Sequence, residues 1–114
     1  MRAISARRRA ELIRRREAVM LVAARDQGRC VLCGSPDVEC HECIPRSAFG
    51  SKTKDACYQE RNMICICQEC HGKVHNPAGR RMLFGRLAER YGYVYNAIET
   101  PWAMEYLTEE EMNA

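Results

Sequence analysis

The sequence predicts a small α+β domain in which apolar burial is not the only source of stability. At 114 residues the chain has room for one modest core. Patterns typical of short strands lie between patterns typical of helices. The eight cysteines are gathered in the middle of the chain and include three C-x2-C pairs. Disulfides are one interpretation, but C-x2-C pairs beside histidines have the spacing of zinc ligands and indicate a reducing, cytosolic compartment.

The first predicted element is a helix over residues 5–27. Ser5 can cap its start, Gly28 can end it, and no proline or glycine lies inside it. Apolar residues recur at helical spacing: Leu12, Val19 and Val22 or Ala23. The run "AVMLVAA" in this helix is not followed by a signal-peptide cleavage site, and no stretch is long enough to cross a membrane, so we expect neither.

Arginines make the start of the chain strongly basic. Residues 1–29 hold nine arginines and three acidic residues, a net charge of +6, whereas residues 99–114 hold five glutamates and no Lys or Arg. The triplets Arg7–Arg9 and Arg14–Arg16 lie seven positions apart, about two helical turns, so they return to the same side. Such an arm is typical of nucleic-acid binding, and a solvated helix face is the alternative.

The centre of the chain is expected to fold as strand, loop, strand and helix. Turn residues in "CVLCGSPD" precede a short strand at about residues 38–44. The polar segment "RSAFGSKTKDACYQER" is expected to be a loop, and "MICI" (63–66) is a second short strand. From "CQECHGKVH" onward the spacing becomes helical.

Two further helices are predicted after the cysteines. The first covers residues 80–91, and its apolar side comprises Leu83, Phe84, Leu87 and Tyr91. The second is capped by Thr100 and has Pro101 at its first position. Its apolar residues are Trp102, Met104, Tyr106 and Leu107. We expect both helices to pack on the core.

Four cysteines have the spacing of a structural zinc site. They form two C-x2-C pairs with 33 residues between them: Cys30 and Cys33, and Cys67 and Cys70. Each pair sits at a turn where two thiolates can converge, and four thiolates close a tetrahedral Zn²⁺ site. Free buried cysteines are the alternative. The spacing does not define a function, because zinc ribbons, knuckles and RING-like modules share it.

The three histidines lie in the same central region. His71 and His75 are four positions apart, so on a helix both imidazoles point the same way. His41 belongs to the first predicted strand. A single histidine is more often a structural residue than a metal ligand, but three of them among the cysteines favour a metal-binding role.

The order "C-x2-C … HECIPRSAFG … N … C-x2-CH-x3-H" resembles the HNH endonucleases, whose ββα-metal fold places two strands and a helix around one divalent ion. "HECIPRS", residues 41–47, matches the first motif of that family. Asn62 matches the middle asparagine, His71 the final histidine, and His75 a further histidine of toxin-type members. The resemblance covers residues 30–75 and not the flanking helices.

The resemblance implies a metal-dependent endonuclease of duplex DNA. His41 and His71 would hold a catalytic divalent cation, Mg²⁺, Mn²⁺ or another, with His75 as a third ligand. Asn62 would brace the loop that positions the general base. Phosphates would be held by arginines of the first helix and of the motif: Arg7, Arg8, Arg14, Arg15 and Arg46. The chain would then comprise a basic helix (1–29), an HNH core (30–79) and packing helices (80–114).

Glu42 departs from the family pattern, in which this position holds a histidine that serves as the general base. An unperturbed glutamate has a pKa near ~4.3 against ~6.5 for histidine, so it is ionised at neutral pH but a weak base. Burial can raise its pKa, or a metal-bound water can be acidified directly. In a third interpretation, His41 is the base and Glu42 a ligand, which requires a strand shifted by one residue.

Cys40 and Cys43 flank this motif and permit a non-catalytic interpretation. Together with the other four cysteines they would build a RING-like or treble-clef module that binds DNA or protein. That interpretation leaves Asn62 and "PRS" (45–47) without a role.

Short chains resembling this one are often encoded by bacteriophages and act beside genome-packaging proteins, so the resemblance implies a phage or prophage origin and the host cytoplasm.

Overall fold

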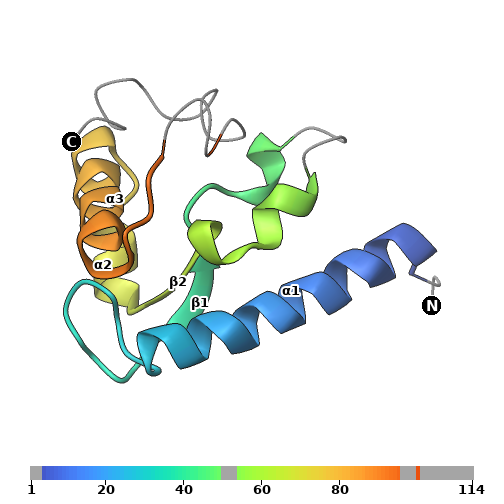
Figure 1. Cartoon of the computed structure of the whole chain (residues 1–114), viewed down its shortest axis with the longest axis horizontal. Helices are drawn as coiled ribbons and strands as arrows, with labels where there is room; N and C mark the ends of the chain where they lie inside the picture. Colours follow the sequence, from blue (N-terminus) through green and yellow to red (C-terminus); the bar gives the residue numbers. More distant parts are fainter. Residues whose placement is uncertain (1–3, 50–53, 96–99, 101–114) are drawn as a thin grey trace.

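The computed structural model describes residues 4–49, 54–95 and 100, and within them the predicted α+β class is confirmed (Figure 1). The regular elements are α1 (Ala6–Asp26), β1 (Glu39–Glu42), β2 (Met63–Ile66), α2 (Gln68–Lys73) and α3 (Pro77–Tyr91). The segment expected to be a loop forms three short 3-10 helices: Arg46–Ala48, Lys54–Tyr58 and Glu60–Asn62. The last predicted helix, beyond Thr100, lies outside the described residues.

Helix α1 begins and ends close to its predicted bounds. The Ser5 side chain accepts a hydrogen bond from the Arg8 N–H at 3.1 Å, and both Gln27 and Gly28 take a positive φ after the last turn. The buried side of the helix comprises Glu11, Ala18, Val22 and Asp26. Leu12 is 37 % exposed, contrary to its place in the predicted apolar series, because the buried side passes through Glu11 instead.

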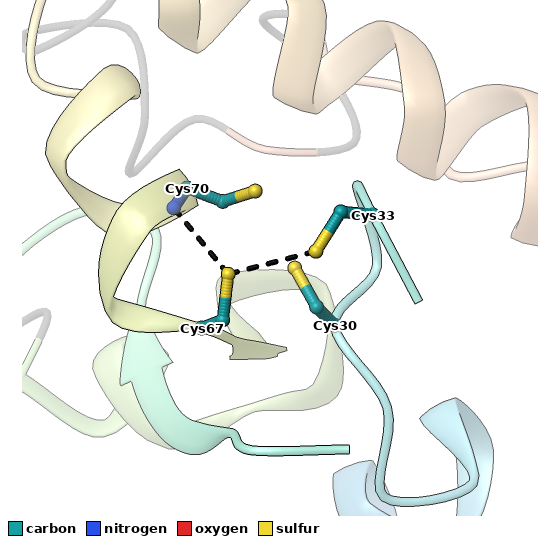
Figure 2. A group of neighbouring side chains, drawn as sticks. All are labelled: Cys30, Cys33, Cys67 and Cys70. Carbon is teal, nitrogen blue, oxygen red and sulfur yellow. Dashed lines mark hydrogen bonds between the residues drawn. The ribbon is translucent and has the colours of Figure 1, made fainter. Parts of the chain in front are cut away.

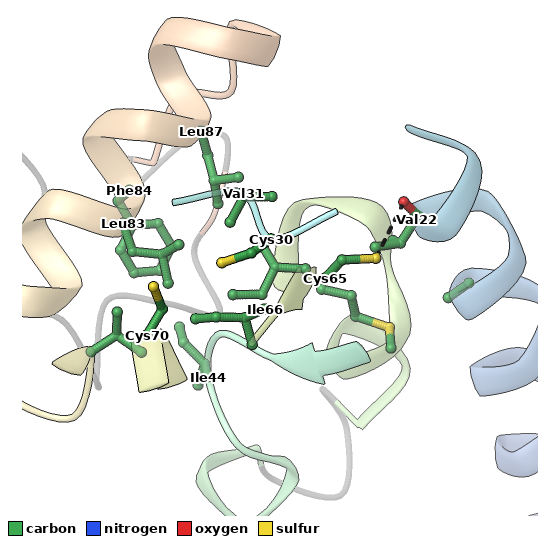
Figure 3. Close-up of a cluster of buried hydrophobic side chains, with 14 of the residues drawn as sticks. Val22, Cys30, Val31, Ile44, Cys65, Ile66, Cys70, Leu83, Phe84 and Leu87 are labelled. Atoms are coloured by element: carbon green, nitrogen blue, oxygen red, sulfur yellow. Dashed lines mark hydrogen bonds between the residues drawn. The ribbon is translucent and has the colours of Figure 1, made fainter. Parts of the chain in front are cut away.

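The two predicted strands are confirmed and pair as an antiparallel sheet. His41 lies opposite Ile64, and Cys40 lies opposite Cys65. Strand β2 is buried along its whole length, because α1 covers one face of the sheet while α2 and α3 lie on the other side (Figure 1). Figure 3 shows this division: Val22 of α1 meets Cys65, whereas Leu83 and Phe84 of α3 approach Ile66 from the opposite side.

A buried carboxylate joins α1 to the sheet and to α3. Asp26, which is 1 % exposed, accepts hydrogen bonds from the Arg25 guanidinium, from the Tyr91 hydroxyl and from the backbone N–H of Cys65. Burial acts against the charged form, but these donors outweigh it and keep the pKa of Asp26 below its usual value. The fully hydrogen-bonded carboxylate therefore fixes the end of α1 against β2.

Helix α3 starts four residues after α2 ends, and one glycine permits their close approach. Asn76 caps α3 by accepting a hydrogen bond from the Gly79 N–H at 2.8 Å. A Cβ atom at Gly79 would overlap the backbone of Lys73 and Val74. The first turn of α3 thus rests directly on the end of α2. The predicted apolar side is confirmed: Leu83, Phe84 and Leu87 are buried, and Tyr91 is half-buried.

Candidate metal centre and histidine pocket

The four predicted zinc ligands converge at one point. One ligand atom from each of the four cysteines lies within 4.8 Å of the others: Cys30, Cys33, Cys67 and Cys70. Figure 2 shows two of these side chains coming from the turn after α1 and two from the start of α2. The Cys33 and Cys67 sulfur atoms are 3.6 Å apart, close to the ~3.8 Å expected for a tetrahedral ion with Zn–S bonds of ~2.3 Å. These residues fit a structural zinc ion.

Hydrogen bonds from backbone N–H groups stabilise both turns that carry the cysteines. In the first turn, the Gly34 N–H donates to the Cys30 carbonyl at 2.9 Å, and Gly34 has a positive φ of 81°. In the second, Cys67 is the N-cap of α2, and its sulfur accepts a hydrogen bond from the Cys70 N–H at 3.4 Å. Although burial favours its neutral thiol, backbone N–H groups, foremost that of Cys67, lower the pKa of Cys30 to about 6. At least one thiolate is therefore favoured near neutral pH.

The three histidines lie together on the α2 side of the sheet. His41 on β1 stacks on His71 of α2 with ring centroids 4.0 Å apart, and His71 lies 4.8 Å from His75. Burial, together with the neighbouring imidazoles, lowers the pKa of His71. A neutral imidazole is the form that binds a metal ion. The sequence predicted this grouping from the motif order.

The imidazoles are near one another without converging on one point. The planes of the His41 and His71 rings are 21° from parallel, so the lone pairs of their ring nitrogens lie in nearly parallel planes and do not point at a shared position. Nε2 of His41 lies 3.2 Å from a carboxylate oxygen of Glu39, which is exposed. Within the described part of the chain, only the four cysteines form a ready set of three or more metal ligands. A catalytic ion would therefore require one of these rings to rotate about its side-chain torsions.

Asn62 braces the turn that follows β1. Its side chain is completely buried, accepts a hydrogen bond from the Ile44 N–H at 2.9 Å and donates to the Ile44 carbonyl at 3.0 Å. It also donates to the Cys57 carbonyl at 2.9 Å. The Asn62 carbonyl in turn accepts the Cys43 N–H at 2.6 Å. One asparagine thus fixes the backbone that leads directly away from His41 and Glu42.

Glu42 lines the pocket that also contains the three histidines. It is half-buried, and its carboxylate is 3.9 Å from Nε of Arg15 on α1. His41 stacks on the His71 ring, so the strand register places His41 on the face of the sheet that carries the other histidines.

The predicted phosphate-binding arginines fall into two groups. Arg46 donates hydrogen bonds from Nε and Nη2 to the Glu11 carboxylate, at 3.0 and 3.2 Å, and Arg8 donates to the same carboxylate at 2.6 Å. These hydrogen bonds lower the pKa of Glu11 to about 2. Arg7 is exposed on the outer side of α1, whereas Arg14 and Arg15 are half-buried. Glu11 was not among the predicted site residues, because its burial depends on Arg46, 35 residues later.

The cysteines of the RING-like interpretation do not join the zinc ligands. Cys40 lies opposite Cys65 across the sheet, and Cys43 follows the end of β1. Burial raises the pKa of Cys40 to about 11 and that of Cys43 to about 12, which favours neutral thiols over metal-binding thiolates. Among the residues that the structure describes, no second cysteine site is formed.

Comparisons with known proteins identify no family for this chain. No family model, no curated protein and no solved structure matches the chain. Within the described residues, no helix has the combination of length and apolar character needed to cross a bilayer.

Proposed function

We propose that the protein is a zinc-stabilised, metal-dependent endonuclease that cuts or nicks duplex DNA. The observation that carries this proposal is the pocket in which distant motif residues meet. His41 comes from β1, His71 from α2 and His75 from the turn that follows it. Asn62, the fourth motif residue, holds the strand end that carries His41. The motif order along the chain and this spatial grouping support the same reaction class.

Hydrolysis of a phosphodiester forms a bond between a water oxygen and phosphorus and breaks the bond to the 3′ oxygen. Glu42 would take the proton of the attacking water, and the leaving oxygen would be protonated from solvent. His41 and His71 would hold the divalent ion, with His75 as a further ligand. When bound, such an ion polarises the phosphate and stabilises the leaving oxygen. Arg15, next to Glu42, would orient that carboxylate.

Helix α1 would bind the duplex through its phosphates. Its exposed arginines include Arg7, Arg9 and Arg16. Such contacts give affinity without sequence choice, and the affinity falls steeply with salt. A phage or prophage origin, action in the host cytoplasm and partnership with genome-packaging proteins belong to the same proposal.

A non-catalytic binding module is the second candidate, and the outer face of α1 favours it. Ile13, Met20 and Leu21 are 45 %, 68 % and 55 % exposed, which is unusual on a helix whose only role is to contact phosphates. A degenerate zinc module that contacts another protein through α1 would account for them. The endonuclease candidate needs the histidine pocket in order to cleave DNA, whereas the binding module does not need it.

Cleavage of plasmid DNA distinguishes these functions. The protein should nick or cut supercoiled plasmid when Mg²⁺, Mn²⁺ or another divalent ion is added, and mild chelation should stop the reaction while the zinc stays bound. His71→Ala should abolish cleavage and leave DNA affinity nearly unchanged. Glu69→Ala, an exposed substitution on the same helix, is the matched control. A wild-type protein that binds DNA but stays inert with every ion would instead support the binding module.

A further inference from the structure

The histidine pocket has a wall that lies outside the sequence motif. The pocket is a cavity of about 310 Å³ that lies between the end of β1, α2 and the first turns of α3. The motif side contributes His41, Glu42 and Arg46, together with His71 and His75. Helix α3 contributes Arg80 and Leu83. Arg80 therefore approaches the histidines from a helix to which the motif assigns no function.

Both arginines of this pocket are anchored by hydrogen bonds within the protein. The guanidinium of Arg46 makes a two-pronged contact with Glu11 on α1, at 3.0 and 3.2 Å, which directs it toward that carboxylate. Arg80 donates Nη1 to the backbone carbonyl of His75 at 3.1 Å. This hydrogen bond holds the Arg80 guanidinium beside the histidine cluster. A planar guanidinium has five N–H donors and suits phosphate oxygens.

The position of Arg80 is fixed by the backbone that precedes it. Its N–H donates to the Asn76 carbonyl at 2.9 Å, within the cap of α3. Gly79, immediately before it, lets this turn rest on the backbone of Lys73 and Val74. The side chain of Arg80 thus starts from a packed helix terminus. A phosphate-binding group is most effective when its support is preorganised in this manner.

We propose that Arg80 is the residue that binds a phosphate group in the histidine pocket. In the reaction proposed above, on which this assignment of the ligand rests, that group is the scissile phosphodiester of DNA. Arg80 would contact its non-bridging oxygens while the histidines face it from β1 and α2. The outer arginines of α1 would bind flanking phosphates instead. Arg80 would then govern the rate of cleavage, and α1 would govern the affinity for DNA.

Two measurements test this role, one of which does not depend on cleavage. Inorganic phosphate is titrated into the zinc-loaded protein, and the imidazole resonances of His41, His71 and His75 are followed by NMR. Phosphate should shift them, and Arg80→Met should weaken its binding about tenfold or more. Arg80→Lys, which keeps the charge without the fork, should be intermediate. Arg86→Met, an exposed change on the same helix, should match the wild type.

The second measurement is plasmid cleavage over a range of DNA concentrations up to saturation, which gives kcat and KM separately. Arg80→Met should lower kcat at least about tenfold while KM changes little, and Arg80→Lys should recover part of the rate. Phosphate binding that is equal in wild type and Arg80→Met, or absent from the wild type at tens of millimolar, would overturn the proposal. If Arg80-dependent phosphate binding is found in a protein that cuts no DNA, the phosphate site stands and the endonuclease function fails. Zinc content and circular dichroism confirm that each variant is folded.

Discussion

Replacing Asn62 by Ala should cost about 3–5 kcal/mol of unfolding free energy, a large share of the ~5–15 kcal/mol of an ordinary domain. Three side-chain hydrogen bonds are lost, each worth about 1 kcal/mol. The N–H and carbonyl of Ile44 and the carbonyl of Cys57 would also lose their partner inside a site that is 0 % exposed. Because the same bonds hold the turn after β1, cleavage should fall as well.

Urea denaturation followed by circular dichroism, with zinc in excess, measures this loss. Asn62→Asp is a second informative change, because it keeps an acceptor for the Ile44 N–H but removes both donors and buries a charge. Asn76→Ala is the matched control: it removes one partly buried cap bond from α3 and should cost about 1 kcal/mol. A loss below about 1 kcal/mol for Asn62→Ala would refute the bracing role.

Other predictions follow from the zinc ligands, α1, Glu42 and Glu11. Metal analysis should find about one tightly held zinc per chain, and Cys67→Ser should unfold the protein, because thiolate binding energy is folding energy in so small a domain; a folded sample without zinc would contradict this. Replacing the exposed Arg7, Arg9 and Arg16 by Ala should flatten the dependence of log K on log salt by roughly 0.9 for each lost contact, whereas an unchanged slope would remove α1 from the DNA interface. If Glu42 is the base, Glu42→Gln should slow cleavage by roughly 10² to 10⁴ and Glu42→His should keep or raise the rate; an active Glu42→Gln variant excludes that role. The pKa of Glu11 is lowered from its ordinary value of 4.5 to about 2. The stabilisation that its carboxylate provides should therefore be complete above about pH 4.5 and should disappear as the pH falls toward 2. The unfolding free energies of wild type and Glu11→Gln, measured against pH, should converge at low pH.

Local signals in the sequence were sufficient for much of the fold. The strand "MICI" is bounded as predicted because four apolar residues in a row fit a strand covered on both faces. Ser5 was identifiable as a cap because its hydrogen bond reaches only three residues along the chain. The convergence of Cys30 with Cys67 could also be predicted, since each pair carries its own turn and zinc chemistry joins them.

Features that depend on long-range packing were not visible in the sequence. Helical spacing cannot show that Glu11 is buried, because that depends on a guanidinium from the turn after β1. Arg80 was missed for a similar reason: its approach to the histidines depends on Gly79 resting on the end of α2. The polar segment between the strands was expected to be a loop, yet its turns are organised by the buried side chain of Asn62.

The four-cysteine ligand set and the histidine pocket share one turn of helix, which would couple zinc-dependent folding to the proposed cleavage. Cys70 and His71 are consecutive, and the His71 N–H donates to the Cys67 carbonyl at 2.8 Å. A zinc ion held by Cys67 and Cys70 would therefore fix the backbone from which the His71 imidazole reaches His41. Two chelator regimes follow from this connection. If the proposed endonuclease function holds, a weak chelator that removes only the proposed catalytic ion should stop cleavage reversibly. A chelator strong enough to extract zinc should release the start of α2, and activity should return only after zinc is restored and the chain refolds.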